Sequence, residues 1–180
     1  PKTLRNMHGS VFEKCKNLKT VTIEDGVTEI GASAFVTSGL ESVVRIPKSV
    51  DEVGSLAFYG CKLKQVIFEA NDGTKIKEIG EMAFEQNRTL ETAVLPDGLQ
   101  EIAQQMFQDC DAMSCVYIPA SVQSIGLDAF QGCKLTDVYY GGTREQWNKI
   151  KKQKGNGALG RAEFHENASG AALQTAAQFF

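Results

Sequence analysis

The chain has 180 residues, of which 42% are hydrophobic and 23% are charged, and its formal net charge is −3. This composition is typical of an ordinary soluble globular protein, and it is not basic enough to favour binding of nucleic acid or of acidic membranes. The sequence has no apolar run of 18 residues and no signal-peptide pattern at its start, so we expect no direct membrane insertion of this segment.

Phenylalanine recurs along the chain at steps of 23, 23, 26, 23 and 23 residues. The six positions are Phe12, Phe35, Phe58, Phe84, Phe107 and Phe130. The full unit reads Leu-x-x-Val-x-Ile-Pro-x-x-Val-x-x-Ile-Gly-x-x-Ala-Phe-x-x-Cys. A short unit repeated at a fixed period indicates a solenoid, in which each coil packs on its neighbours. We therefore predict a right-handed α/β solenoid with about 23 residues per coil, short parallel strands and short helical turns, closed by a C-terminal cap.

The chain opens inside a coil, with Met7 and Cys15 at repeat positions and no polar cap before them. We therefore expect residues 1–17 to be a truncated first coil cut from a longer array. Residues 18–135 carry five full coils, which begin at Leu18, Leu40, Leu63, Leu90 and Met113. An insertion in coil three, residues 69–75, accounts for the single step of 26, and its Asn-Asp-Gly turn predicts a bulge at a corner.

Each full coil begins with an alternating pattern that predicts a strand with one buried face. In coil one, Val21 and Ile23 alternate with threonines, and a proline or an Asp-Gly pair then ends the strand. A second extended step carries Val27 and Ile30 inward. The Gly-x-x-Ala-Phe segment that follows is too short for an independent helix, so we predict a single helical turn held by packing.

Coil four departs from the repeat at two positions. Ala103 stands in place of the usual glycine, and Met106 stands in place of the small alanine that precedes the phenylalanine elsewhere. Because these small residues let neighbouring coils approach, we expect local loosening near coil four.

After Leu135 the repeat breaks, and residues 136–166 are predicted to form a cap of strand, helix and strand. Thr143 and Gln146 make a capping box that opens a helix with Trp147 and Ile150 on one face. Ala162 and Phe164 then alternate like a final short strand. Residues 167–180 fit neither repeat nor cap; a docking helix, the start of another domain and a cloning remnant all remain open.

Five cysteines suggest at first a disulfide or metal framework. Most of them, however, lie three residues after the repeat phenylalanine, a position that serine and asparagine occupy in other coils. The position is filled by Cys15, Ser38, Cys61, Asn87, Cys110 and Cys133. A site that accepts all three residue types favours a structural ladder of small groups bonded to turn backbone amides over a disulfide or a metal site. Cys115 falls on the outward face of a strand and is predicted to be an exposed free thiol.

Aligning the strands on the Ile-Pro position predicts two outward columns of side chains. The first contains Thr20, Val43, Gln65, Thr92, Cys115 and Asp137, and the second contains Thr22, Arg45, Ile67, Val94, Tyr117 and Tyr139. The second column is apolar and aromatic in adjacent coils, a composition that marks interaction surfaces. It is the candidate protein-binding face, although the same residues also satisfy β propensity and pair across strands.

No catalytic or cofactor motif stands out. A column of Glu29, Glu52, Glu78 and Glu101 could collect calcium, but a solvated charged edge is the simpler interpretation, so we predict no metal site. The two histidines, His8 and His165, lack partners at catalytic spacing. We therefore expect neither an enzyme nor a cofactor.

The coil Ile-Pro-x-x-Val-x-x-Ile-Gly-x-x-Ala-Phe-x-x-Cys, followed by VYYGGT and a tryptophan, resembles the leucine-rich repeat proteins of the BspA type over about residues 7–165. The resemblance implies five leucine-rich repeat coils, a location at the cell surface or secretion, and an adhesin-like role toward an extracellular-matrix or host surface protein. It supplies no catalytic residues. The rival hypothesis is a structural spacer that displays other domains of a larger surface protein.

Overall fold

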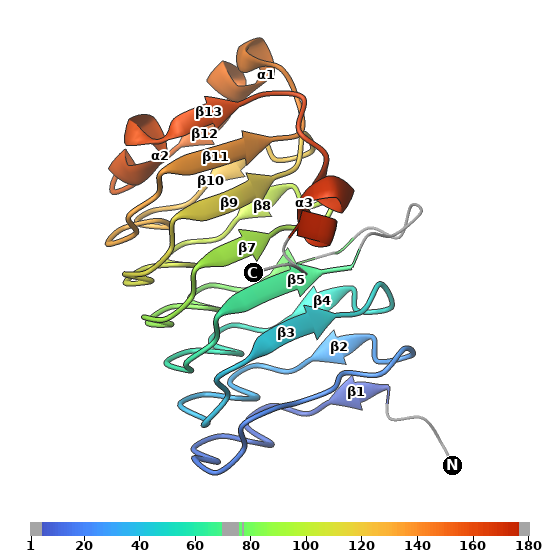
Figure 1. Cartoon of the computed structure of the whole chain (residues 1–180). Helices are drawn as coiled ribbons and strands as arrows, with labels where there is room; N and C mark the ends of the chain where they lie inside the picture. Colours follow the sequence, from blue (N-terminus) through green and yellow to red (C-terminus); the bar gives the residue numbers. More distant parts are fainter. Residues whose placement is uncertain (1–4, 70–75, 77, 177–180) are drawn as a thin grey trace.

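The computed structural model describes residues 5–69, 76 and 78–176, and only the backbone of residues 174–176. The coils stack along one axis, and successive strands lie side by side (Figure 1). The long strands form one parallel six-stranded sheet. They are β3 (Val43–Ile46), β5 (Gln65–Phe68), β7 (Thr92–Val94), β9 (Cys115–Ile118), β11 (Asp137–Tyr140) and β13 (Glu163–His165). The predicted parallel-strand solenoid is confirmed.

Two-residue strands form a second face of the stack, where the coil takes its second extended step. One sheet contains β1 (Asn6–Met7), β2 (Glu29–Ile30), β4 (Glu52–Val53) and β6 (Glu78–Ile79). The other contains β8 (Glu101–Ile102), β10 (Ser124–Ile125) and β12 (Lys151–Lys152). In most of these strands a buried apolar residue, such as Ile30 or Ile102, stands beside an outward polar residue; β12 consists of two exposed lysines.

The first full coil lacks the strand predicted at residues 20–23. Val21 and Ile23 still turn toward the core, but the segment has no strand pairing. A single backbone bond in this part of the coil, from the Glu41 N–H to the Lys19 carbonyl, ties it to coil two. Among the described residues, β3 is therefore the edge of the long-strand sheet.

The corner that carries the repeat phenylalanine is a run of turns rather than the single helical turn predicted. In coil one, the N–H groups of Ala34, Val36 and Ser38 bond carbonyls three residues back. The intervening N–H groups of Ser33 and Phe35 reach carbonyls of the next coil instead. Residues such as Ser33 take a left-handed conformation, with φ of 59°, to allow this alternation. Half of the corner amides thus hold neighbouring coils together, which a helix would not permit.

The core is built around the phenylalanine column. Successive rings from Phe12 to Phe130 stack with centroids 5.2, 5.0, 5.3, 5.5 and 5.5 Å apart. The five rings from Phe35 onward are fully buried, whereas Phe12 is half-buried. Leucine, isoleucine and valine from both strand faces pack around this column in one continuous cluster.

The loosening expected near coil four is visible on the second face. Glycine at the corner lets adjacent coils touch: a Cβ on Gly126 would lie 2.6 Å from the Gln104 nitrogen. Ala103 carries such a Cβ at the equivalent position of coil four. Among the described residues, β6 and β8 do not pair, so the two-residue strands divide into separate sheets at this point. Met106 nevertheless fits the core without exposure.

The cap contains the predicted capping box and helix. Helix α1 (Arg144–Lys149) begins after Thr143, whose hydroxyl accepts the Gln146 N–H while the Gln146 side chain accepts the Thr143 N–H. Trp147 and Ile150 are buried over the last coil. Beyond the helix the chain makes a further turn of the stack, which ends in β13, where the final short strand was expected around Phe164. The short strand β12 and helix α2 (Gly157–Arg161), which lie before β13 in this turn, were not predicted.

Two predicted segments extend past the described residues. The coil-three insertion, residues 69–75, lies outside them apart from Glu69. The tail contains helix α3 (Gly170–Ala176), and its last four residues are not described. Within the described ranges, no helix has the length and apolarity needed to cross a membrane.

Replacing Phe84 with alanine should lower the free energy of unfolding by about 3–5 kcal/mol, because a fully buried ring with stacked neighbours on both sides is removed. Phe12→Ala, at the half-buried end of the column, should cost less than about 2 kcal/mol. Urea unfolding of both variants measures the difference. Equal losses would show that the column does not share one continuous core.

Candidate functional site

Strand register places the two predicted columns side by side on the outward face of the long-strand sheet. Arg45, Ile67, Val94, Tyr117, Tyr139 and His165 pair in succession from β3 to β13, and we call this set the outer row. The first column runs beside it through Val43, Gln65, Thr92, Cys115, Asp137 and Glu163. Thr22 is exposed but lies outside any strand.

The middle of the outer row is not exposed, contrary to expectation. Ile67, Val94 and Tyr117 are 0%, 4% and 4% exposed, yet none of them belongs to the main core cluster. They are therefore buried on the outside of the sheet. Arg45 remains exposed and Tyr139 is half-buried, so the row is open only toward its two ends.

Helix α3 lies against this outward face, where it contacts β7 (Figure 1). The turn before it is fixed by two backbone bonds, from the Asn167 N–H to the Gly142 carbonyl and from the Ala168 N–H to the Tyr140 carbonyl, each 2.9 Å. Buried Gly170 then packs on the Tyr117 ring, so closely that a Cβ would lie 2.8 Å from a ring carbon. Because α3 starts at this glycine, the helix can approach the sheet.

Burial changes the chemistry of Tyr117. Its hydroxyl donates to Asp97 Oδ1 at 3.3 Å. Loss of solvent, with the nearby Asp97 carboxylate as a second cause, raises the pKa of Tyr117 to about 12. The phenol therefore stays neutral and acts as a hydrogen-bond donor beneath the start of α3.

A cavity of about 470 Å³ remains between the sheet and α3. Its walls include Val94, Cys115, Tyr117, Tyr139 and Leu173, and its polar part includes Gln65 and Thr92. Gln65 Oε1 and Thr92 Oγ1 are buried and accept no hydrogen bond from the described residues. The cavity thus combines an apolar wall with two unsatisfied acceptors, which is the composition of a ligand site.

Cys115 faces this cavity and is not the exposed thiol that was predicted. All five cysteines are free, and Cys115 is partly buried. Burial, with the Asp137 charge as a second cause, raises its pKa to about 11. The thiolate is therefore scarce at neutral pH, which argues against a nucleophilic role.

The predicted small-residue position makes hydrogen bonds between coils, and its cysteines donate to backbone carbonyls, whereas bonding to backbone amides was expected. Cys61, Cys110 and Cys133 donate to the phenylalanine carbonyl of the preceding coil at 3.1, 3.3 and 3.2 Å. Asn87 donates to the Phe58 carbonyl at 2.8 Å and also accepts the Leu63 N–H. Ser38 contacts the Cys61 sulfur at 3.3 Å, whereas Cys15 is exposed.

Asn156 continues this column in the cap and was missed. Its amide donates to the Gly126 carbonyl at 2.8 Å and accepts the Phe130 N–H at 3.1 Å. The signal was present in the spacing, because Asn156 follows Cys133 by 23 residues, the step that separates all the other neighbouring positions except Cys61 and Asn87.

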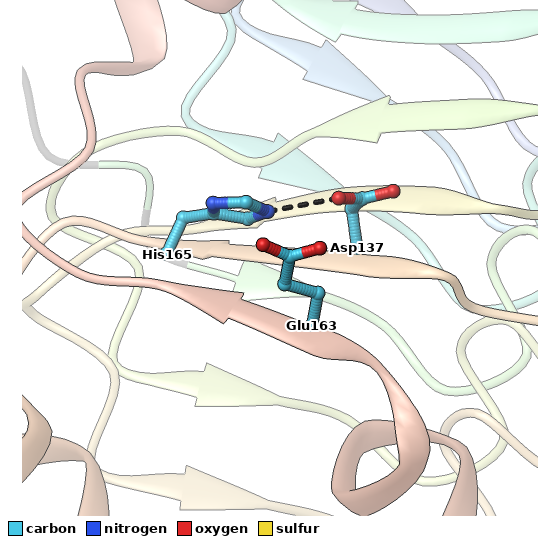
Figure 2. A group of neighbouring side chains, drawn as sticks. All are labelled: Asp137, Glu163 and His165. Carbon is cyan, nitrogen blue, oxygen red and sulfur yellow. Dashed lines mark hydrogen bonds and ion pairs between the residues drawn. The ribbon is translucent and has the colours of Figure 1, made fainter.

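Asp137, Glu163 and His165 meet at the cap end of the outward face (Figure 2). Their ligand atoms lie within 4.8 Å of one another, and nitrogen and carboxylate oxygen are ligands that zinc accepts. His165 Nε2, however, is already bonded to Asp137 Oδ1 at 2.8 Å, and its ring stacks on Tyr139 at 4.3 Å. In this arrangement the bond between His165 and Asp137 links the side chains of β11 and β13.

A scan of protein-family descriptions matches residues 1–44 and 42–150 to the BspA type leucine rich repeat region, in six copies. No curated protein matches the sequence.

Among solved structures, a leucine-rich repeat protein from Bacteroides ovatus matches with a TM-score of 0.66 and 22% identity, covering 77% of this chain and 35% of that one. A leucine rich cell surface protein from Faecalibacterium prausnitzii matches with a TM-score of 0.49, 21% identity and coverage of 82% and 66%. The T. pallidum leucine rich repeat protein matches with a TM-score of 0.48 and 29% identity, covering 72% of this chain and 53% of that one. The chain thus spans about a third of the length of the Bacteroides protein, with which it shares the fold.

Asn87→Val should lower the free energy of unfolding by about 2–3 kcal/mol, because the buried Phe58 carbonyl and Leu63 N–H both lose a partner. Asn87→Cys, which restores a donor to the carbonyl, should cost less. Urea unfolding of the two variants tests this order. A valine variant as stable as the cysteine variant would contradict a bonding role.

Asp137 should make the cap pH-dependent. Hydrogen bonds from His165 and then Thr136 lower the pKa of its carboxyl below the ordinary 3.8. Stability from a lowered acid pKa is complete above the unfolded-state value and is lost as the pH falls through the folded-state value. Asp137→Asn should therefore be slightly less stable than the native chain at pH 6, and the gap should close below about pH 4. Denaturation at pH 6, 4 and 3 measures it; a gap independent of pH would contradict the assignment.

Proposed function

The chain belongs to the BspA type leucine-rich repeat family, and on that premise we propose that it is a non-enzymatic, adhesin-like protein-binding module of a cell-surface or secreted protein. Its partner would be an extracellular-matrix or host surface protein, bound by the outward strand face and adjoining turns. The family and its fold typically carry no catalysis, and the high pKa of Cys115 gives no support to a thiol enzyme.

The outward face is the observation that carries the proposal. Its outer row is apolar over consecutive strands although it is not part of the core that folds the protein. Protein–protein interfaces are typically apolar at the centre and polar at the rim. Here Val43 is 38% exposed beside the exposed Arg45, at the end of the face that α3 leaves open.

The size of the face favours binding through several copies. Six strands about 4.8 Å apart, each with roughly 10–13 Å of length, give the whole face about 300–400 Å², and the buried middle of the outer row leaves less than that exposed. A standard interface takes about 800 Å² from each partner. A single module would therefore bind weakly, and tethered modules or further coils would raise the avidity.

A spacer that displays other domains is the second candidate. The covering of Val94 and Tyr117 favours it, because a face sealed by its own chain has less surface to offer a partner.

To separate these functions, the chain is tested alone and as a tethered multimer for binding to a panel of extracellular-matrix proteins. We expect saturable binding by the multimer that Val43→Glu/Arg45→Glu weakens at least about tenfold, since both exposed side chains lie on the open end of the face. Surface plasmon resonance supplies the affinities.

A matched control is Val11→Glu/Arg161→Glu, which makes the same two changes at exposed positions away from the strand face. Its binding should equal that of the native chain. An equal loss of binding in both variants would show that the change in net charge, and not the strand face, weakens binding. If no multimer binds any of the proteins, the spacer is favoured.

A further inference from the structure

Helix α3 depends on the sheet for its existence. Its seven residues read GAALQTA. Isolated helices shorter than about 12 residues are marginal in water. A side-chain cap holds its first turn, because the Ser169 hydroxyl oxygen accepts the Ala172 N–H at 3.4 Å. The segment therefore belongs to the low-stability end of the molecule, where local opening costs little free energy.

The fit of α3 to the face is close at one point and poor at another. Gly170 packs directly on Tyr117, but Leu173 borders the cavity of about 470 Å³ without filling it. Gln65, whose side chain is almost fully buried, lines that space next to Thr92 in the paired strand, and its Oε1 has no hydrogen-bond partner among the described residues. An occupant with a larger apolar group and a hydrogen-bond donor would complement the face better than α3 does.

We infer that α3 is a displaceable internal occupant of the outward strand face, and that the partner segment which replaces it is a short helix. That helix presents glycine or alanine to Tyr117, a side chain larger than leucine to the cavity, and a donor to Gln65 and Thr92. The inference rests on the proposed function, since it names the kind of segment that the same face binds and the contact that regulates access to it.

Displacement of α3 can be measured without any partner, because Cys115 faces the cavity under the helix. In a Cys15→Ser background, Cys115 is the only remaining cysteine that is not buried among the described residues. Gly170→Leu places a side chain against the Tyr117 ring and should accelerate labelling of Cys115 by a thiol reagent by at least about tenfold. Leu173→Trp, which fills the cavity, should slow it.

The matched control is Gly160→Leu, because a Cβ at Gly160 in α2 meets no atom within 4 Å. It should label like the native chain, and circular dichroism should show all variants folded. Unchanged labelling in Gly170→Leu would overturn displacement. If Gly170→Leu labels faster only because the whole chain unfolds, the buried Cys61, Cys110 and Cys133 are labelled at the same time. In that case Leu173→Trp decides. Slower labelling of Cys115 in that variant supports the inference, and unchanged labelling overturns it.

The nature of the occupant is tested with a peptide of residues 167–176 that carries Leu173→Trp. Tryptophan fluorescence anisotropy should show that it binds the Gly170→Leu chain at least about tenfold more tightly than the native chain, whose face is occupied. Failure to bind the opened chain would overturn the helical occupant. Binding of the peptide together with no binding to any matrix protein would uphold the inference while the proposed function fails.

Discussion

The spacing between coils is the constraint on which this structure depends. Strand pairing sets neighbouring coils about 4.8 Å apart, and the stacked phenylalanine rings follow at 5.0 to 5.5 Å. Every corner must meet the same separation. It does so with small residues at the contact, left-handed residues that turn amides toward the next coil, and a donor that reaches the carbonyl of the coil before. Met106 shows that one bulkier side chain can be accommodated, since it is fully buried and its carbonyl still accepts the Phe84 N–H of the coil before.

Repeat register predicted which residues share a column, because a column is a direct consequence of period. The phenylalanine stack, the outward rows and the cap helix followed from spacing and from one capping box. Local conformation was harder to predict. Corner residues such as Ser33 adopt positive φ without being glycine, since bonds to the next coil hold them there, and nothing in the local sequence signals that geometry.

The solvent exposure of outward side chains could not be predicted from the repeat register. Alternation along a strand says toward which side a residue points, but whether solvent reaches it depends on what else lies on that side. Tyr117 points outward as predicted and is nevertheless buried, because Gly170, more than fifty residues later in the chain, folds back onto its ring. The covering segment has no repeat and little apolar bulk, so its sequence carries no signal for its docking place.

The interruption at Ala103 affects how the stack responds to force. At this coil the long strands β5, β7 and β9 remain paired, while within the described part of the chain β6 and β8 on the other face do not. The long-strand face is thus continuous, whereas on the second face coils three and four have no strand pairing among the described residues and are joined at the corner, for example from the Phe84 N–H to the Met106 carbonyl. We therefore expect the stack to bend most easily between coils three and four, about an axis that the long-strand sheet sets.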